Sequence, residues 1–134
     1  PIPLLYRELD LAYPGSKFIL TMRDEMEWLD SVRNHWSQNN PYRAAWNGDP
    51  FTHRVHKLLY GQKWFDPDVM LNRYRAHNAE VREYFAKRPA DLLIMDMTKG
   101  AGWHELCGFL RQRIPEDPYP HQFVSNQYAA GAGI

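Results

Sequence analysis

The chain has 134 residues, 44% of them apolar and 24% charged, which are proportions typical of a soluble globular protein of about one domain. Its 16 basic residues balance 16 acidic ones, so the composition excludes a nucleic-acid binder that relies on overall positive charge. The single cysteine, Cys107, excludes a disulfide framework and a cysteine-rich zinc site. We therefore expect a cytoplasmic protein without a nucleic-acid partner, and no apolar run approaches the ~20 residues of a membrane span.

The first predicted elements are a helix, a strand and a second helix. An amphipathic pattern over residues 4–13 predicts the first helix. The apolar run FILTM at 18–22 predicts a strand covered on both faces, as in a parallel sheet. Asp24 is a predicted N-cap, and Glu27 completes a capping box with it. The helix that they begin is expected to end near residue 37.

Later segments continue the alternation of helix and strand. Asp49 and Asp66, each followed by a proline, are the predicted N-caps of two further helices, at 51–60 and 68–87, and Gly61 is expected to end the first of them. A second apolar run at 92–95 predicts another strand, and the apolar spacing over 103–110 predicts a last helix. The proline-rich tail from 115 to 134 is expected to be irregular.

This order of elements predicts an α/β fold, helix-rich, with parallel strands covered by helices. Without repeats or an obvious linker, residues 1–134 are expected to form one domain. Two strands are too few for a complete doubly wound sheet, and the chain opens without methionine inside an amphipathic segment. We therefore expect a partial fold that is incomplete at its N-terminus.

Arg23 and Ser31 are the candidate anion-binding residues. Arg23 follows the first strand, at the carboxyl edge where open α/β sheets bind ligands. The next helix directs its N–H groups and positive dipole end at the same place. Seven residues at about 100° each nearly complete whole turns, so Asp24, Trp28, Ser31 and His35 share one face. An arginine fork and a serine hydroxyl there suit a phosphate; the alternative is an exposed arginine and a serine packed in a helix contact.

The segment YRELDLAYPGSKFILTMRDEMEWLDSVRNHW resembles the sulfotransferase family, whose members transfer a sulfuryl group from 3′-phosphoadenosine 5′-phosphosulfate (PAPS). In that family a serine eight positions after the arginine binds the donor's 3′-phosphate with it, which is the spacing of Arg23 and Ser31. The W-x-x-S of Trp28 to Ser31 is similar to the bacterial-type branch. The segment YRAHNAEVREYFAKRPADLLIMDMTKGAGWHELCGFLRQRIPEDPYPH resembles the family's closing half. The resemblance implies a three-layer P-loop-like fold with PAPS as donor.

Two parts of the family pattern are missing from this chain. The family's first strand and phosphate loop are expected upstream of Pro1, and no G-x-x-x-x-G-K-[ST] loop occurs in the sequence. The usual general base also falls upstream, so the catalytic residue is unknown. Lys99 and Gly100 follow the second strand and are interpreted as a turn before the last helix.

Other polar residues have weaker functional interpretations. His35 could be a base or a substrate contact, because histidine titrates near neutrality; the alternative is packing beside Trp36. His53 and His56 could share a metal but lack a visible third ligand, so no metal site is predicted. His77 is interpreted as a core residue.

Three further features have structural interpretations. Most tryptophans are expected in the core. Asp96 is interpreted as structural, and the arginines of the 68–87 helix as a solvated face: Arg73, Arg75 and Arg82.

Three functions follow from these observations. The first is a sulfotransferase portion that binds the 3′-phosphate of PAPS for transfer to a hydroxyl or amine of an unknown small-molecule acceptor. Its acceptor pocket is expected from the loops at 39–49 and 62–67. The second is a non-catalytic binding or assembly module, whose exposed sheet edge pairs with another copy or another chain. The third, a P-loop kinase-like protein, lacks the Walker lysine that it requires.

Overall fold

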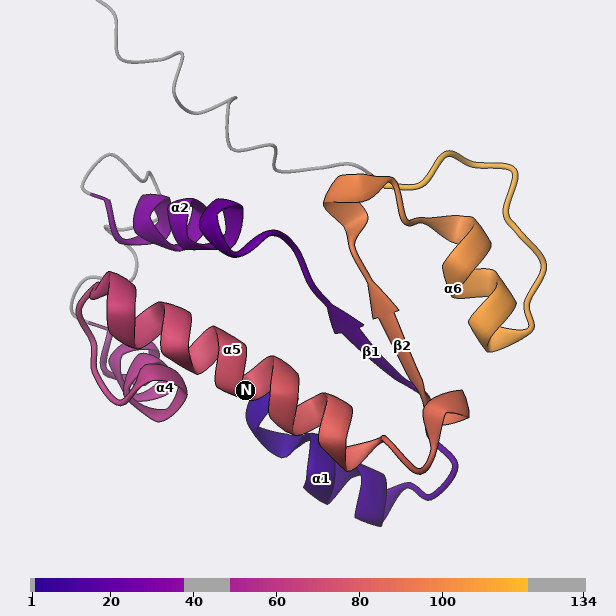
Figure 1. Cartoon of the computed structure of the whole chain (residues 1–134), viewed down its shortest axis with the longest axis horizontal. Helices are drawn as coiled ribbons and strands as arrows, with labels where there is room; N and C mark the ends of the chain where they lie inside the picture. Colours follow the sequence, from indigo (N-terminus) through magenta and orange to yellow (C-terminus); the bar gives the residue numbers. More distant parts are fainter. Residues whose placement is uncertain (1, 38–48, 121–134) are drawn as a thin grey trace, which may run out of the picture.

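The computed structural model describes residues 2–37 and 49–120. Figure 1 shows two short strands flanked by helices, with one long helix running beside them. In chain order the described elements are α1 (Ile2–Ala12), β1 (Phe18–Thr21), α2 (Glu25–Trp36), α4 (Pro50–Tyr60), α5 (Pro67–Tyr84), the 3₁₀ turn η1 (Pro89–Asp91), β2 (Leu92–Met95), the 3₁₀ turn η2 (Met97–Lys99) and α6 (Trp103–Leu110).

The two strands pair in parallel, as the sequence predicts. Phe18 lies opposite Leu92, and Thr21 lies opposite Met95. The first strand ends one residue earlier than expected, although Met22 N–H still donates to the Met95 carbonyl at 2.7 Å. Because the strands are parallel, the residues that follow each of them lie at the same edge of the sheet.

Helices cover the sheet from two sides. On one side, Tyr6 of α1 and Val81 of α5 form a buried cluster with Leu20 of β1 and with Phe85. On the other side, α6 lies against β2 and contributes the buried Cys107. This helix-rich arrangement of parallel strands between helices confirms the predicted α/β class and is consistent with a partial sulfotransferase P-loop-like fold.

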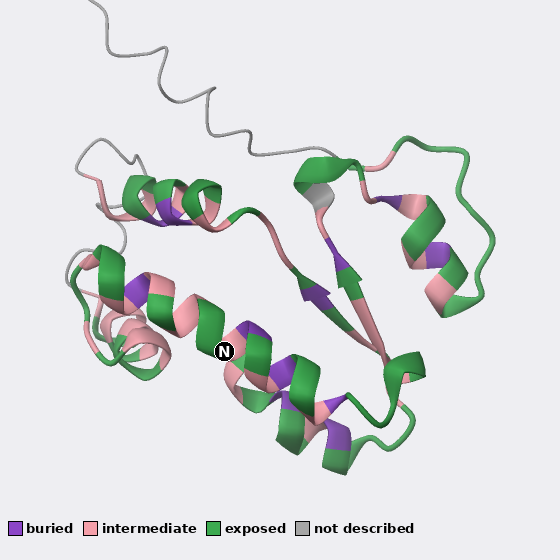
Figure 2. Ribbon diagram, viewed as in Figure 1, coloured by how far each residue is buried: buried purple, intermediate pink, exposed green. Residues whose placement is uncertain are grey.

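A second cluster joins α2 to α5. Leu29 and Val32 of α2 pack with Met70, which is completely buried on α5. Figure 2 shows buried positions along most of α5, whereas α4 has none. The long helix therefore belongs to both clusters and connects them.

The predicted N-caps are confirmed, but the capping box predicted at the start of α2 does not form, because the Glu27 carboxylate pairs with Arg23 instead. The side chains of Asp24, Asp49 and Asp66 each accept hydrogen bonds from two N–H groups in the first turn of their helices. Gly61 ends α4 with φ of 76°, a left-handed conformation in which a side chain is strained. These signals depend on neighbouring residues only, which is why the sequence reveals them.

The predicted end of α5 is wrong by three residues. The expected helix reached residue 87, but α5 ends at Tyr84, and Phe85 adopts φ of −92° and ψ of 4°. Phe85 is 1% exposed because it is buried in the α1–β1 cluster. The chain then turns so that Arg88 reaches Asp10 of α1. Phe85 N–H still donates to the Val81 carbonyl at 3.1 Å, so Phe85 is the C-cap of α5, and its ring lies on the same helix face as Val81.

Asp10 holds α1 against the end of α5. Its carboxylate is buried, accepts two hydrogen bonds from Arg88 at 2.6 and 3.0 Å, and accepts one from Tyr84 at 2.7 Å. The Arg88 guanidinium and the Tyr84 hydroxyl hold the pKa of Asp10 below its ordinary value. A buried carboxylate is stable only with such partners. This contact fixes the entry into β2.

The described part of the predicted tail is irregular, as the sequence indicates. Residues 115–120 have no regular structure, and the Trp103 indole N–H donates to the Asp117 carbonyl at 2.9 Å. The remainder of the tail, residues 121–134, lies outside the described residues, and the assignment of the whole chain to one domain stays a prediction. Across residues 2–37 and 49–120, no helix combines the length and the apolar character that crossing a membrane requires.

The burial of Phe85 predicts a large effect on stability. We expect Phe85→Ala to lower the free energy of unfolding by about 3–5 kcal/mol, because it leaves a cavity between the sheet and two helices. Phe51→Ala is the matched control, since Phe51 is 68% exposed on α4, and it should cost about 0.5 kcal/mol or less. Urea unfolding monitored by circular dichroism measures both values, and equal losses would contradict the assigned core.

Candidate anion-binding site

Asp24 caps the helix that follows the candidate anion site. Its Oδ1 accepts from Met26 N–H at 2.9 Å and from Glu27 N–H at 3.2 Å. The sequence predicts that N–H groups at this helix start are free to bind an anion, and for these two groups that prediction is wrong. A phosphate at this junction must therefore be held mainly by side chains.

Arg23 lies between the last sheet residue and this cap, at the carboxyl edge of the strands. Its Nη2 donates to Glu27 Oε2 at 3.3 Å, in a partly exposed ion pair. Its Nε is buried and, within the described part of the chain, has no hydrogen-bond partner. Glu27 thus pairs with Arg23, in addition to donating its N–H to Asp24.

An unpartnered buried N–H is costly, and an anionic oxygen would satisfy it. A guanidinium nitrogen without a partner is suited to a phosphate oxygen, whereas Nη2, the other nitrogen of the same fork, already donates to Glu27. Arg23 therefore fits the role of a phosphate ligand, although its pairing with Glu27 opposes an anion. The assignment of Arg23 stays a prediction.

Ser31 lies on the same helix but further along it. Eight residues separate it from Arg23, and the seven from Asp24 to Ser31 correspond to about 10 Å along the axis. Ser31 is half-buried, and no hydrogen bond joins it to Arg23 in the described structure. The structure therefore places the two predicted residues on one strand–helix unit without bringing them into direct contact.

Tyr74 is a site residue that the sequence analysis missed. Its hydroxyl donates to the Arg23 carbonyl at 2.9 Å and accepts from the Arg23 N–H at 3.1 Å. Its ring stacks on Trp28 with a centroid distance of 4.4 Å and an interplanar angle of 20°. No local signal in the sequence links Tyr74 to Arg23, because the two residues are far apart along the chain.

The arginines of α5 also make tertiary contacts that their exposed pattern does not predict. Arg75 donates to both oxygens of Glu25, with distances from 2.6 to 3.0 Å. The Arg75 hydrogen bond holds the pKa of Glu25 below its ordinary value. Arg73 Nε donates to the Leu59 carbonyl at 3.2 Å, and Arg82 Nη2 lies 3.2 Å from the sulfur of Met22. These contacts join α5 to its neighbours, so the face is more than solvated surface.

His35 is near the far end of α2, about 15 Å along the helix axis from its start. Its ring contacts Trp36 with a centroid distance of 4.8 Å and His56 with one of 5.7 Å. Burial, with a smaller effect of His56, lowers the pKa of His35 below its ordinary value. This environment agrees with the packing alternative, and it also keeps the imidazole neutral, as a base requires. A catalytic role for His35 stays a prediction.

His53 and His56 are possible metal ligands from the sequence, and His56 is in an aromatic contact. His56 packs against Trp36 at 4.4 Å, in the contact between α4 and α2. In residues 2–37 and 49–120, no group of three histidine, cysteine or acidic side chains could hold a metal ion. Asp96 caps η2 by accepting from Thr98 N–H at 3.0 Å, so its contacts are those of a structural residue.

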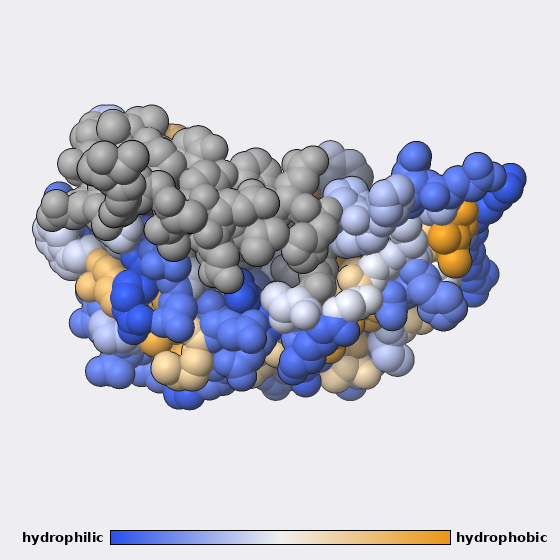
Figure 3. Space-filling model, turned by 90° about the horizontal axis from the view of Figure 1, so that it is seen from above, coloured by the Kyte–Doolittle hydropathy of each residue, from blue (hydrophilic) through white to orange (hydrophobic). Residues whose placement is uncertain are grey.

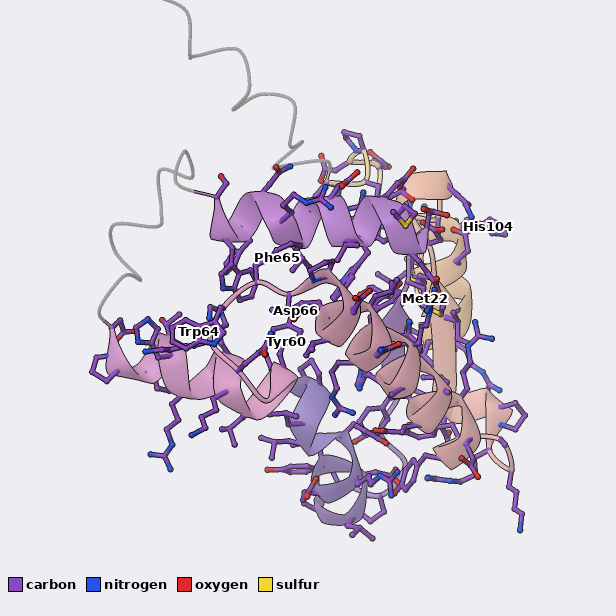
Figure 4. All side chains as sticks on the ribbon, turned by 60° about the vertical axis from the view of Figure 1, so that its left-hand side comes forward. Met22, Tyr60, Trp64, Phe65, Asp66 and His104 are labelled. Carbon is purple, nitrogen blue, oxygen red and sulfur yellow. The ribbon has the colours of Figure 1, made fainter. Side chains whose placement is uncertain are left out.

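The predicted acceptor loops are only partly described. Residues 39–48, including Trp46, lie outside the described residues. In the second loop, Phe65 packs against the α2–α5 cluster, and Figure 4 shows it with Tyr60 between α2 and α4. Trp64 in the same loop is 63% exposed. The other described tryptophans, Trp28, Trp36 and Trp103, are only partly buried, so the expectation that most tryptophans lie in the core is wrong for the described residues. The acceptor assignment of this loop stays a prediction.

A cavity of about 290 Å³ lies beside β1, next to Trp28 and Tyr74. All four residues of β1 contribute to its wall, together with the polar side chains of Arg73, His77 and Asn78 on α5. His77 also makes an edge contact with Tyr6, at 6.1 Å, which agrees with its predicted packing role. Since alternate residues of a strand point to opposite faces, a cavity lined by all four follows the strand's edge.

Comparison with known proteins identifies the class of protein that this fold and site define. The sulfotransferase domain family matches residues 1–128, and the chain belongs to that family. A similar curated protein is "Ava biosynthesis cluster protein M" of Aspergillus versicolor, with 28% identity over 142 aligned residues. The match covers 94% of this chain and 53% of that protein, so the chain spans about half the length of the relative.

Three histidines make the fold sensitive to mild acid. Burial lowers the pKa of His35, His56 and His77, so below about pH 6.5 the unfolded chain binds protons that the folded chain does not. Their contribution to stability is complete above that pH and is lost as the pH falls. We therefore expect Tm to decrease between about pH 7 and pH 5.

A matched pair of variants tests the origin of this dependence. His35→Gln should flatten the pH profile of Tm, because it removes one of the buried groups. His104→Gln should leave the profile unchanged, since His104 is exposed on α6 and points away from the helices in Figure 4. Scanning calorimetry at several pH values gives both profiles, and identical slopes for the two variants would refute the assignment to His35.

Proposed function

We propose that this chain is the portion of a PAPS-dependent sulfotransferase that binds the donor's 3′-phosphate through Arg23 and Ser31. The single observation that carries the proposal is the buried Nε of Arg23, which has no hydrogen-bond partner among the described residues and lies at the carboxyl edge of two parallel strands. Membership of the sulfotransferase domain family supports PAPS as the donor. The acceptor is a hydroxyl or amine of a small molecule of unknown structure.

The chain's contribution to such a reaction is positioning. In sulfuryl transfer the sulfur–oxygen bond to the donor's phosphate breaks as a bond forms from sulfur to the acceptor oxygen or nitrogen, and the acceptor proton goes to a base. Charge lies on the peripheral oxygens, so orientation and electrostatic stabilisation dominate. Arg23 and Ser31 would hold the donor at a distance from the reacting sulfur, and no base is assigned in this chain.

Adenosine 3′,5′-bisphosphate, the product form of the donor, tests the proposal. We expect Arg23→Ala to weaken its binding to the protein at its natural full length by about 1.5–3 kcal/mol, the value of a charged hydrogen bond. Ser31→Ala, which removes a neutral partner, should cost about 0.5–1.5 kcal/mol. Isothermal titration calorimetry measures both.

Arg33→Ala is the matched control for charge. Arg33 lies on the same helix, is exposed and pairs with Asp30, so its removal should change the affinity by less than about 0.5 kcal/mol. An unchanged affinity in Arg23→Ala would remove Arg23 from the site. Equal losses of affinity in Arg23→Ala and Arg33→Ala would show that the effect comes from the overall charge of the protein.

A second candidate function is supported by the edge of the sheet. Within the described residues β1 pairs only with β2, and Ile19 on β1 is 45% exposed beside the cavity. An apolar, unpaired strand edge is a site for pairing with another chain. A non-catalytic assembly module would use this edge to pair with a second copy. Figure 3 shows a few apolar patches within a mostly hydrophilic described surface on the face seen there.

The oligomeric state tests this candidate. If β1 pairs with a second copy, sedimentation equilibrium should give a dimer, and Ile19→Lys should shift it toward monomer by introducing a charge at the edge. Leu11→Lys is the control, because Leu11 is 78% exposed on helix α1 and is not part of the strand. A monomeric unmodified protein would eliminate the pairing of copies through this edge.

A further inference from the structure

The peptide groups of Arg23 lie between the sheet and the helix. The last backbone hydrogen bond to β2 comes from Met22 N–H, and the first of α2 runs from Trp28 N–H to the Asp24 carbonyl at 2.9 Å. Arg23 therefore has no partner in either pattern. Unpaired backbone groups in a partly buried junction are unfavourable, so their partners decide the local conformation.

Tyr74 provides both partners with one atom. Its hydroxyl accepts from the Arg23 N–H at 3.1 Å and donates to the Arg23 carbonyl at 2.9 Å, using both capacities of a phenol. Two hydrogen bonds from one oxygen restrict both dihedral angles of Arg23. They therefore also restrict the direction in which its side chain leaves the backbone.

The position of the Tyr74 hydroxyl is itself fixed. The ring stacks on Trp28, and the neighbouring Arg75 holds Glu25 at the start of α2. One helical turn before Tyr74, Met70 is completely buried against α2. The packing of α5 on α2 therefore fixes the position of the Tyr74 hydroxyl relative to Arg23.

We infer that Tyr74 is a positioning residue for Arg23, which holds the arginine backbone so that the guanidinium is oriented toward the 3′-phosphate of the donor. This inference rests on the proposed function, because it needs Arg23 to bind that phosphate. Tyr74 acts through Arg23 and does not touch the ligand. Its contribution therefore requires both the Arg23 side chain and a 3′-phosphate.

A comparison of two nucleotides separates this role from a structural one. Adenosine 3′,5′-bisphosphate carries the phosphate in question, and adenosine 5′-monophosphate lacks it. Tyr74→Phe removes the hydroxyl and keeps the ring stacked on Trp28. We expect it to weaken binding of the bisphosphate by about two- to tenfold, as for the loss of ordinary hydrogen bonds. Binding of the monophosphate should change by less than about twofold.

The Arg23→Ala background provides the second readout. In that background Tyr74→Phe should have no further effect on the bisphosphate, because the side chain that it orients is missing. Tyr84→Phe is the matched control on the same helix, since its hydroxyl bonds Asp10 instead. It should reduce Tm and leave the affinity for both nucleotides unchanged. All measurements use the protein at its natural full length.

Each result decides between the interpretations. Equal losses for both nucleotides, or the full loss again in the Arg23→Ala background, would show a structural effect and overturn the inference. An unchanged bisphosphate affinity in Tyr74→Phe, with a loss in Arg23→Ala, would overturn it while the proposed function stands. If the unmodified protein binds the two nucleotides equally, the proposed function fails and the inference fails with it.

A measurement on the unmodified protein covers the case in which Tyr74→Phe does not fold. Addition of adenosine 3′,5′-bisphosphate should slow hydrogen exchange at the Arg23 amide, because the ligand then holds the Arg23 side chain while Tyr74 holds its backbone. If the exchange rate of this amide does not change when the ligand binds, the inference is overturned.

Discussion

The packing of α5 is the constraint on which the other described elements depend. Val81 and the adjoining Phe85 join it to β1 and α1, while Met70 joins it to α2. Arg73 connects it to the end of α4. One helix thus sets the distance between the two buried clusters, and the strand–helix junction with Arg23 lies between them. A two-stranded sheet alone is only marginally stable, so this helix has to provide the rigidity.

At the junction between β1 and α2, each acidic side chain has a hydrogen-bond partner within the described structure. Asp24 accepts two backbone N–H groups, and Glu25 is held by Arg75. Glu27 pairs with Nη2 of Arg23, whereas the buried Nε of Arg23 has no hydrogen-bond partner among the described residues. The helix start is largely satisfied by Asp24, so recognition of an anion depends on the arginine. This differs from phosphate loops, in which backbone N–H groups bind the ligand.

Much of the fold can be predicted from the sequence, and the reason is local chemistry. Caps at Asp24, Asp49 and Asp66 and the stop at Gly61 involve only neighbouring residues. Apolar runs likewise indicate both strands. The end of α5 could not be predicted to the residue, because the turn after Phe85 brings Arg88 to Asp10 on α1, which is distant in sequence. The free N–H groups expected at α2 were wrong because the cap itself uses them.

The sequence by itself determined the α/β class, the strand–helix junction and the candidates Arg23 and Ser31, since spacing along one chain is enough for these. Only the tertiary structure decided that Tyr74, 51 positions from Arg23, holds its backbone. It also decided that one buried nitrogen of the guanidinium has no hydrogen-bond partner within residues 2–37 and 49–120. Hydrogen bonds between distant segments depend on how helices pack, and packing depends on the whole set of buried side chains, which no local pattern in the sequence records.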